Sequence, residues 1–261
     1  MAASLNMSAV ALTIAIAVFY SQHTVLSQRH AGVLNASCNA LTIDPPSVAA
    51  VPDHAVDMGR FISLAVKAAT SAPDVLLLGD SITAAFDADA LQHLLPTGMS
   101  ILNSGEGADT TTNLLWRIEN GNLPLTSPKF VTVLIGTNNT VRPNQSGEII
   151  ADGIVTILEA IRTRLPKSRI IIISILPRGQ YSTEPLRVPI KKTNELIRKC
   201  ADEDVLFYVD LWNQFLNSDG TIWEGLTTDD YLHPTKAGNL IIYNAIANII
   251  SQVGTGSEKY K

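Results

Sequence analysis

The sequence predicts an α/β protein in which helices cover both faces of a parallel five-stranded sheet. Two observations support this class. Short apolar runs rich in β-branched residues recur along the chain, and stretches with helical periodicity separate them. The runs lack polar alternation, which is typical of strands that are covered on both faces. We therefore expect a three-layer α/β/α sandwich.

The elements are expected in alternating order. The apolar runs place the five strands at residues 75–78, 99–102, 131–135, 170–175 and 205–209. The helical stretches are 83–95, 110–119, 147–164, 190–201 and 235–252. In the last of these, the side chains expected to face the sheet are Leu240, Ile241, Tyr243, Ala245, Ile249 and Ile250.

The composition supports one folded domain. The 261 residues are 46% hydrophobic and 16% charged, which excludes a disordered chain and suffices for a sizeable core. The net charge of −5, without a run of basic residues, argues against a nucleic-acid partner. We expect the domain to span 71–253. A lead-in segment at 29–70, with a helix near 58–69, precedes it, and a flexible tail at 254–261 follows.

The N-terminus has the features of a targeting segment. No charged residue precedes Arg29, and 9–20 are apolar except for Thr13. This run matches the core of a secretory signal and is shorter than the roughly 20 residues that span a bilayer. We expect 1–28 to be a signal peptide and the protein to be exported. Since no positive charge precedes the run, a membrane anchor at 9–20 or a buried helix stays open.

The two cysteines, Cys38 and Cys200, leave two alternatives. They form a disulfide if the protein is exported, or they are two buried free thiols. Two distant cysteines without a neighbouring histidine do not make a zinc site. We expect no metal and no cofactor.

The first strand leads directly into Gly79-Asp80-Ser81-Ile82, where a helix is expected to begin. Ligand sites of parallel sheets lie at the carboxyl ends of the strands. The unpaired N–H groups of a helix N-terminus stabilise an oxyanion there, so Ser81 is a candidate nucleophile. The alternative is that Ser81 or Asp80 only caps the helix.

Two further loops follow strands at the same edge. The second strand ends in the small-residue loop 103–110, whose Gly105-x-Gly107 resembles a dinucleotide fingerprint, but Thr110 stands where the third glycine would be. The third strand ends in Gly136-Thr137-Asn138-Asn139. The side-chain amide of Asn138 is a candidate donor to an oxyanion, or it forms a turn.

The last candidates precede the final helix. Asp230 and His233 stand three residues apart, and no other histidine follows His93. On a tight turn the carboxylate orients the imidazole and stabilises its protonated form. The alternative is that Asp229 or Asp230 caps the helix. Ser81, Asn138, Asp230 and His233 are therefore all expected at one edge of the sheet.

This order of motifs resembles the GDSL, or SGNH, hydrolase family, over about residues 73–252. The matching blocks are Gly-Asp-Ser-Ile, Gly-Thr-Asn-Asn and Asp-x-x-His-Pro. Within the family, the segments 109–111, 115–121, 135–139 and 176–179 are similar to the catalytic subunits of platelet-activating factor acetylhydrolase IB. The resemblance implies a flavodoxin-like fold, a catalytic triad of Ser81, Asp230 and His233, and a homodimer.

The resemblance also implies an oxyanion hole built from Ser81, Asn138 and a glycine, but Ala108 stands at the glycine position. A backbone N–H survives this change. A glycine-only conformation would cost about 1 kcal/mol or more for alanine. The expected export is a second departure, because the subunits that the chain resembles are cytosolic.

From these residues we expect a serine esterase that hydrolyses a small-molecule ester with a small acyl group, through an acyl-serine intermediate. Two alternatives share the fold: a carbohydrate O-acetyl esterase, and a lysophospholipase or thioesterase. A third, from another class, is a binding module without activity.

Overall fold

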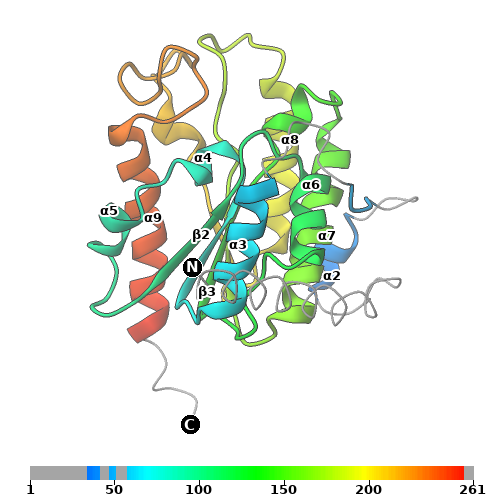
Figure 1. Ribbon diagram of the computed structural model, residues 1–261. Coiled ribbons are helices and arrows are strands. Elements are labelled where there is room, and N and C mark those ends of the chain that lie inside the picture. Colours follow the sequence, from blue (N-terminus) through cyan, green and yellow to red (C-terminus); the bar gives the residue numbers. More distant parts are fainter. Residues whose placement is uncertain (1–33, 42–46, 51–57, 256–261) are drawn as a thin grey trace.

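The computed structural model describes residues 34–41, 47–50 and 58–255 (Figure 1). The expected signal segment 1–28, with its apolar run 9–20, lies outside these residues. Helix α9 continues through Gly254 to Thr255, so the part of the expected tail beyond it, 256–261, also lies outside them.

The centre of the molecule is a five-stranded parallel sheet, as predicted. Its strands are β1 (Val75–Gly79), β2 (Ile101–Gly105), β3 (Phe130–Leu134), β4 (Arg169–Ile173) and β5 (Leu206–Val209). They lie in the order β2-β1-β3-β4-β5, and every pair is parallel. The carboxyl ends of all five strands therefore meet at one edge of the sheet.

Helices cover both faces (Figure 1). One face packs on α6 (Thr111–Glu119), α7 (Gly147–Arg164) and α8 (Arg187–Ile197), with α3 (Met58–Thr70) beside them. The opposite face packs on α4 (Ser81–Ala84), α5 (Ala88–Gln92) and α9 (Lys236–Thr255). Successive strand residues alternate between these cores: Leu76 and Leu78 belong to the first, Val75 and Leu77 to the second. The three-layer sandwich is confirmed.

Three helix predictions need correction. The helix expected at 83–95 is divided into α4 and α5, because Asp87 has extended backbone and its side chain accepts a hydrogen bond from Ala90 N–H, starting a new helix. Helix α8 begins at Arg187, ahead of the expected start, because Pro189 is tolerated in the first turn. In α9, Leu240 is 49% exposed instead of buried.

The lead-in segment is attached to the domain by a disulfide. It contains the short helix α2 (Ala36–Asn39), whose Cys38 is bonded to Cys200 across 162 residues, with a Cα–Cα distance of 4.4 Å. Cys200 ends the 3₁₀ helix η2 (Arg198–Cys200), and Asn35 Nδ2 donates to its carbonyl oxygen. Of the two alternatives for the cysteines, the structure shows the bridge.

The lead-in also contributes the predicted helix near 58–69, observed as α3. Its Phe61 ring lies against Trp116 of α6, with ring centroids 5.1 Å apart. Two further 3₁₀ helices, η1 (Asn138–Thr140) and η3 (Trp212–Phe215), follow β3 and β5. Within the described ranges, every helix is too short or too polar to cross a bilayer.

Candidate active site

Ser81 is placed by the sharp turn from β1 into α4. Asp80 caps this helix by accepting a hydrogen bond from Ile82 N–H at 3.0 Å, so Ser81 is its first residue. The turn requires a glycine before it, because a Cβ on Gly79 would lie 2.2 Å from Thr83 Oγ1 and 2.3 Å from a backbone carbonyl. Asp80 therefore caps the helix, and the Ser81 hydroxyl takes no part in the cap.

The structure brings Ser81, His233 and Asp230 together in one hydrogen-bonded series. Ser81 Oγ lies 2.9 Å from His233 Nε2, although 152 residues separate them. His233 Nδ1 lies 2.5 Å from Asp230 Oδ2. When Asp230 accepts the Nδ1 proton, Nε2 is free to accept the hydroxyl proton of Ser81. This geometry supports proton transfer from the serine to the histidine.

Asp230 is held firmly on its turn. Its Oδ1 accepts hydrogen bonds from the N–H groups of Leu232 and His233, at 2.9 and 3.0 Å, and from Thr228 Oγ1 at 2.7 Å. Burial acts to raise the pKa of Asp230, but the hydrogen bonds from His233, Thr228 and Leu232 outweigh it and hold the pKa below its ordinary value. The group therefore stays a carboxylate, which stabilises a protonated His233.

Two loops carry the other expected oxyanion donors, Ala108 and Asn138, and hydrogen bonds connect these loops to β1 and to each other. The loop after β2 is attached to β1, because Glu106 N–H donates to Gly79 O at 3.1 Å. Asn138 Nδ2 donates one hydrogen to Asp109 O at 2.9 Å, and its amide carries a second hydrogen. Ala108, next to Asp109, has a φ of 62°. Ala108 thus adopts the left-handed backbone conformation, which is energetically less costly for glycine than for alanine.

The neighbouring Asn139 connects the same two loops, a role that the sequence did not indicate. Its Oδ1 accepts a hydrogen bond from Thr111 N–H at 3.0 Å, and its Nδ2 donates to Thr111 Oγ1 and to Gln145 Oε1. The side chain is completely buried. The two neighbouring asparagines therefore connect the same loops at different points, Asn138 through Asp109 and Asn139 through Thr111.

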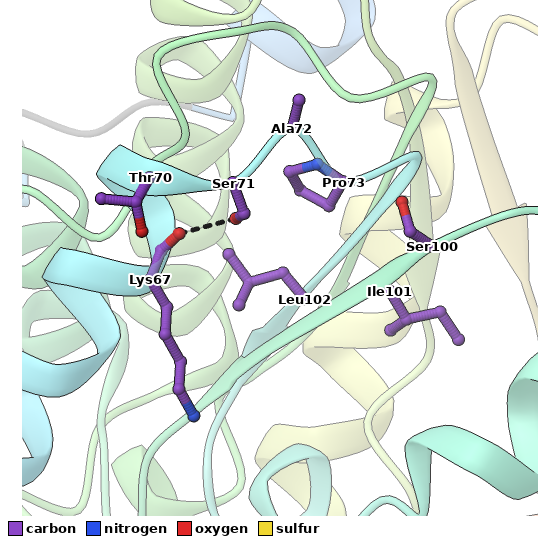
Figure 2. Close-up of a pocket in the computed structure, with 8 residues that line it drawn as sticks. All are labelled: Lys67, Thr70, Ser71, Ala72, Pro73, Ser100, Ile101 and Leu102. Carbon is purple, nitrogen blue, oxygen red and sulfur yellow. Dashed lines mark hydrogen bonds between the residues drawn. The ribbon is translucent and has the colours of Figure 1, made fainter.

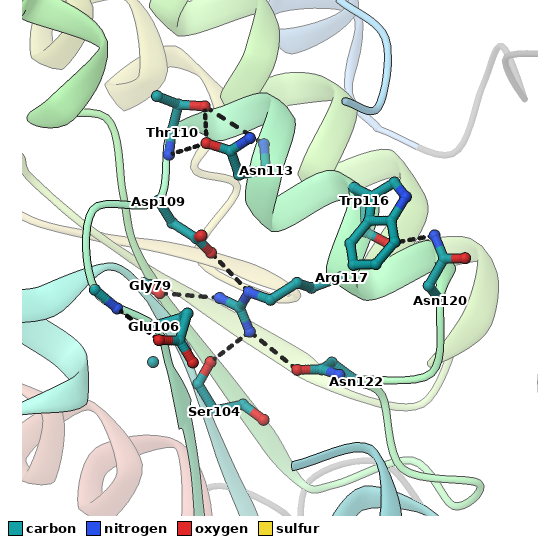
Figure 3. Close-up of polar contacts among 12 residues, drawn as sticks. Gly79, Ser104, Glu106, Asp109, Thr110, Asn113, Trp116, Arg117, Asn120 and Asn122 are labelled. Carbon is teal, nitrogen blue, oxygen red and sulfur yellow. Dashed lines mark hydrogen bonds and ion pairs between the residues drawn. The ribbon is translucent and has the colours of Figure 1, made fainter. Parts of the chain in front are cut away.

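A buried arginine lies beneath these loops (Figure 3). Arg117 is 0% exposed and its Nε donates to Asp109 Oδ2 at 2.6 Å. The other two guanidinium nitrogens donate to Gly79 O, Ser104 O and Asn122 Oδ1. One side chain thus connects the carboxyl ends of β1 and β2 with the loop that carries Ala108. Burial raises the pKa of Asp109 to about 6, although the Arg117 cation opposes this.

Asp80 is the second buried carboxyl group at the site. It is 1% exposed, and burial raises its pKa to about 7. The field of Asp109 adds to the rise, while the hydrogen bond from Ile82 N–H and the fields of His233 and Arg178 oppose it. The carboxyl group beside Ser81 therefore titrates near neutral pH.

An arginine from the loop after β4 completes this edge of the sheet. Arg178 Nη1 donates to Thr137 O at 3.1 Å, and its charge interacts with the carboxyl groups of Asp230 and Asp80. Its loop is also bonded to the loop that carries the histidine, because Gly179 N–H donates to Tyr231 O at 2.9 Å. In the sequence, Arg178 was noted only as part of the 176–179 motif.

Two cavities lie away from Ser81. One, of about 410 Å³, is at the amino ends of β1 and β2, opposite the site (Figure 2), and is lined by Lys67, Thr70, Ser71, Ala72, Pro73, Ser100, Ile101 and Leu102. The other, of about 330 Å³, lies between α8 and the segment after β5. Among the described residues, no three His, Cys, Asp or Glu side chains are grouped to hold a metal ion.

The fold and the site define a class of protein, an ester-hydrolysing enzyme with an α/β/α sandwich. Comparison with known proteins agrees. The model of the GDSL-like lipase/acylhydrolase family matches residues 77–241, and the chain belongs to this family.

Curated relatives show which members of the family this chain is similar to. Platelet-activating factor acetylhydrolase IB subunit alpha1 of Bos taurus is 33% identical over 184 residues, which cover 70% of this chain and 77% of the relative. Subunit alpha2 of Rattus norvegicus is 36% identical over 185 residues, covering 69% and 77%. An acetylxylan esterase from Geobacillus stearothermophilus shares the fold, with a TM-score of 0.55, 21% identity, and coverage of 69% of this chain and 94% of the esterase.

Proposed function

We propose that this protein is a serine esterase that releases a small acyl group from a carboxylic ester through an acyl-serine intermediate. The observation that carries the proposal is the hydrogen-bonded series of Ser81, His233 and Asp230 at the carboxyl edge of the sheet. A serine hydroxyl in contact with an imidazole, which is itself oriented by a carboxylate, is the arrangement that activates a hydroxyl as a nucleophile.

The reaction follows from this geometry. Ser81 Oγ attacks the carbonyl carbon while His233 Nε2 takes the hydroxyl proton, and Asp230 stabilises the imidazolium. The N–H groups of Ser81 and Ala108 and the free Nδ2 hydrogen of Asn138 receive the oxyanion, each typically worth about 3 kcal/mol in the transition state. The tetrahedral intermediate then expels the alcohol, which takes the proton from His233. Water repeats the two steps and releases the acid.

Labelling with a fluorophosphonate tests the nucleophile. Wild-type protein should be labelled at Ser81 and should hydrolyse p-nitrophenyl acetate, whereas Ser81→Ala should do neither. Ser182→Ala is the matched control, because Ser182 is exposed on the loop after β4. His233→Ala should lose about 100-fold or more of the rate, as for a general base. Labelling of another serine would contradict the assignment, and folded protein without any turnover would favour the binding module.

The small acyl group is supported by the relatives, which are named acetylhydrolases. The motif residues Leu115 and Leu176 are buried in the core, and Trp116 packs against Phe61. These side chains therefore give no evidence for a small acyl pocket. For p-nitrophenyl esters from acetyl to octanoyl, kcat/KM should fall with chain length. A rise of about 0.8 kcal/mol in transition-state stabilisation per added CH₂ would instead indicate an open apolar groove and a lysophospholipase. Acetylated xylan tests the carbohydrate alternative.

We also propose that the protein functions outside the cytosol. The charge-free N-terminus supports export, and the Cys38–Cys200 bridge is a bond that persists in oxidising compartments. Expression of the full chain with fractionation of cells and medium, followed by N-terminal sequencing, tests this. Secreted protein that begins after about residue 28 is expected, and full-length protein in the membrane fraction would indicate an anchor.

A further inference from the structure

We propose that Arg187 is a positioning residue, which holds His233 within hydrogen-bond distance of Ser81. It acts on the turn 228–233, the histidine turn, which carries both Asp230 and His233. This inference rests on the proposed esterase function. It adds a residue of another element, α8, to the series of Ser81, His233 and Asp230.

The side chain of Arg187 joins two loops at the carboxyl edge of the sheet. It is 2% exposed, and each of its three nitrogens donates to a backbone carbonyl: Nε to Arg178 O at 3.1 Å, Nη2 to Gly179 O at 2.7 Å and Nη1 to Gly220 O at 2.5 Å. Arg178 and Gly179 lie in the loop after β4, and Gly220 lies between β5 and α9. A buried guanidinium is costly unless its donors are bonded, so Arg187 fixes these two loops relative to each other.

Gly179 connects Arg187 to the histidine turn, 228–233. Its carbonyl oxygen accepts a hydrogen bond from Arg187, and its N–H donates to Tyr231 O, in the middle of the turn, at 2.9 Å. The position requires glycine, because its φ is 76° and a Cβ would lie 2.5 Å from the Glu184 side chain. A single residue therefore separates the guanidinium from the histidine turn.

The histidine turn needs support from outside, because its own hydrogen bonds fix only its shape. His233 N–H donates to Asp230 Oδ1, and Tyr231 N–H donates to Thr228 O, both within the turn. Tyr231 has a φ of 52°, in the left-handed region that is unfavourable for residues other than glycine. Among the described residues, the bond from Gly179 is the one that joins the backbone of this turn to the loop of another strand. We expect the turn to relax, and His233 to move, when Gly179 is no longer held.

The distance that this support controls is the one over which the proton moves. Ser81 Oγ and His233 Nε2 lie 2.9 Å apart, although the two residues follow different strands, β1 and β5. A general base works only within hydrogen-bond reach of the proton that it takes, and a misplacement of about 1 Å can cost about 100-fold in rate. The bond between Asp230 and His233, in contrast, lies within the turn and moves with it. Loss of Arg187 should therefore slow proton transfer without changing how Asp230 orients the imidazole.

Arg187→Met tests this role, because it keeps the length of the side chain and removes all of its donors. For p-nitrophenyl acetate, kcat should fall about 10- to 100-fold while KM stays within about twofold, and the acid limb of the pH profile should stay at its wild-type position. A fluorophosphonate should still label every molecule at Ser81, at a rate lowered by the same factor. Arg187→Lys should recover part of the rate, because it keeps the charge with only one nitrogen.

Arg162→Met is the matched control. Arg162 Nη1 also donates to two backbone carbonyls, Pro166 O at 2.9 Å and Ser168 O at 3.0 Å, but these lie just before β4, at the end of the strand opposite the histidine turn. Its loss should lower the melting temperature and leave kcat within about twofold of wild type. Should Arg187→Met fail to fold, Arg187→Lys carries the test, with a lowered kcat, an unchanged KM and a full count of labelled sites.

A kcat within about twofold of wild type in Arg187→Met, or in Arg187→Lys where only that variant folds, would overturn the positioning role. An equal loss of kcat in Arg162→Met would also overturn it. So would a loss of rate that matches a loss of labelled sites, because Arg187 would then only maintain the folded state. Failure of the proposed function gives a different result, in which wild-type protein does not hydrolyse p-nitrophenyl acetate and Ser81 is not labelled.

Discussion

Ala108 carries a conformational cost, because its backbone conformation is one that favours glycine. Its φ of 62° lies in the left-handed region, which costs an L-residue about 1 to 2 kcal/mol. The next residue, Asp109, is held by Arg117 and Asn138, so the surrounding contacts fix this conformation.

Replacement of Ala108 by glycine should therefore stabilise the protein without loss of activity. We expect Ala108→Gly to raise the free energy of unfolding by about 1 kcal/mol and to leave kcat nearly unchanged. Urea unfolding and p-nitrophenyl acetate turnover measure the two effects. Gly107→Ala is the matched control, because Gly107 has no positive φ and open space around its Cα, and it should not destabilise. A lower free energy of unfolding for Ala108→Gly than for wild type would contradict the inference that the Ala108 backbone is strained.

Asp80 gives the stability a dependence on pH. Because burial raises its pKa from 3.8 to about 7, the folded state keeps a proton that the unfolded chain releases between these values. The free energy of unfolding thus falls as pH rises through this window, by on the order of 4 kcal/mol from this group. Asp109, with a pKa of about 6, acts in the same direction.

Removing the charge of Asp80 should flatten this dependence. Asp80→Asn keeps an acceptor for Ile82 N–H, so its stability should be close to wild type at pH 5 and higher than wild type at pH 8. Urea unfolding at several pH values is the measurement. Asp87→Asn, at the exposed N-cap of α5, is the control that should follow the wild-type slope. Parallel slopes for Asp80→Asn and wild type would mean that Asp80 is ionised throughout.

At the scale of elements, α6 is attached to the ends of β1 and β2 through the buried Arg117 (Figure 3). Loss of the Arg117 side chain would remove the cation that pairs with the buried Asp109 carboxylate. We expect Arg117→Leu to cost about 3 to 5 kcal/mol in unfolding free energy and to lower kcat, because the loop that carries Ala108 loses its support.

Arg60→Leu is the matched control for Arg117, because Arg60 forms an exposed ion pair with Glu106 on the same loop. Exposed pairs of this kind contribute about 1 kcal/mol or less. Urea unfolding and esterase assays of both variants make the comparison. Similar small effects for Arg117→Leu and Arg60→Leu would show that the buried network does not position the loop.

Four of the five strands lie within two residues of their predicted bounds, because strands that are buried on both faces are mostly apolar. The prediction of the second strand at 99–102 is wrong at its end, because β2 continues through the polar residues Asn103 and Ser104 to Gly105. The break between α4 and α5 depends on Asp87, whose N–H also donates to Tyr243 Oη from α9. A contact between segments 156 residues apart leaves no local pattern, and a continuous helix was therefore predicted.

The same distinction applies to the site. Ser81, Asp230 and His233 could be singled out, because Ser81 follows the first strand, Asp230 and His233 stand together before the last helix, and each carries a recognisable functional group. Their roles stay a prediction until Ser81 is labelled. The role of Arg117 could not be predicted, since its partners include the backbone carbonyls of Gly79 and Ser104 at the ends of two strands. A buried arginine that binds carbonyls is indistinguishable in sequence from an arginine on the surface.

At the scale of the whole molecule, the Cys38–Cys200 bridge connects the lead-in to the segment before β5. A cross-link of this kind restricts the unfolded chain, and loss of a native disulfide typically costs about 2 to 5 kcal/mol. We expect Cys38→Ser/Cys200→Ser to be less stable by this amount but active at 25 °C, because neither residue contacts the site.

Urea unfolding with and without reductant tests the contribution of the bridge. Reductant should destabilise wild-type protein and should not affect the double variant. Equal stability of wild-type protein in both conditions would show that the bridge is absent in solution or contributes nothing.

The bridge also determines what a protease can separate. Residues 38–200 form a covalent ring that contains Ser81, Asn138 and Arg178, whereas Asp230 and His233 lie outside it. A single cut within the ring leaves one covalently joined molecule, which runs at full mass on a non-reducing gel and divides only with reductant. A single cut between 201 and 229, near the exposed Trp223, leaves Ser81 and His233 on two fragments that no covalent bond joins. Resistance of activity to nicking should therefore depend on the side of Cys200 on which the chain is cut.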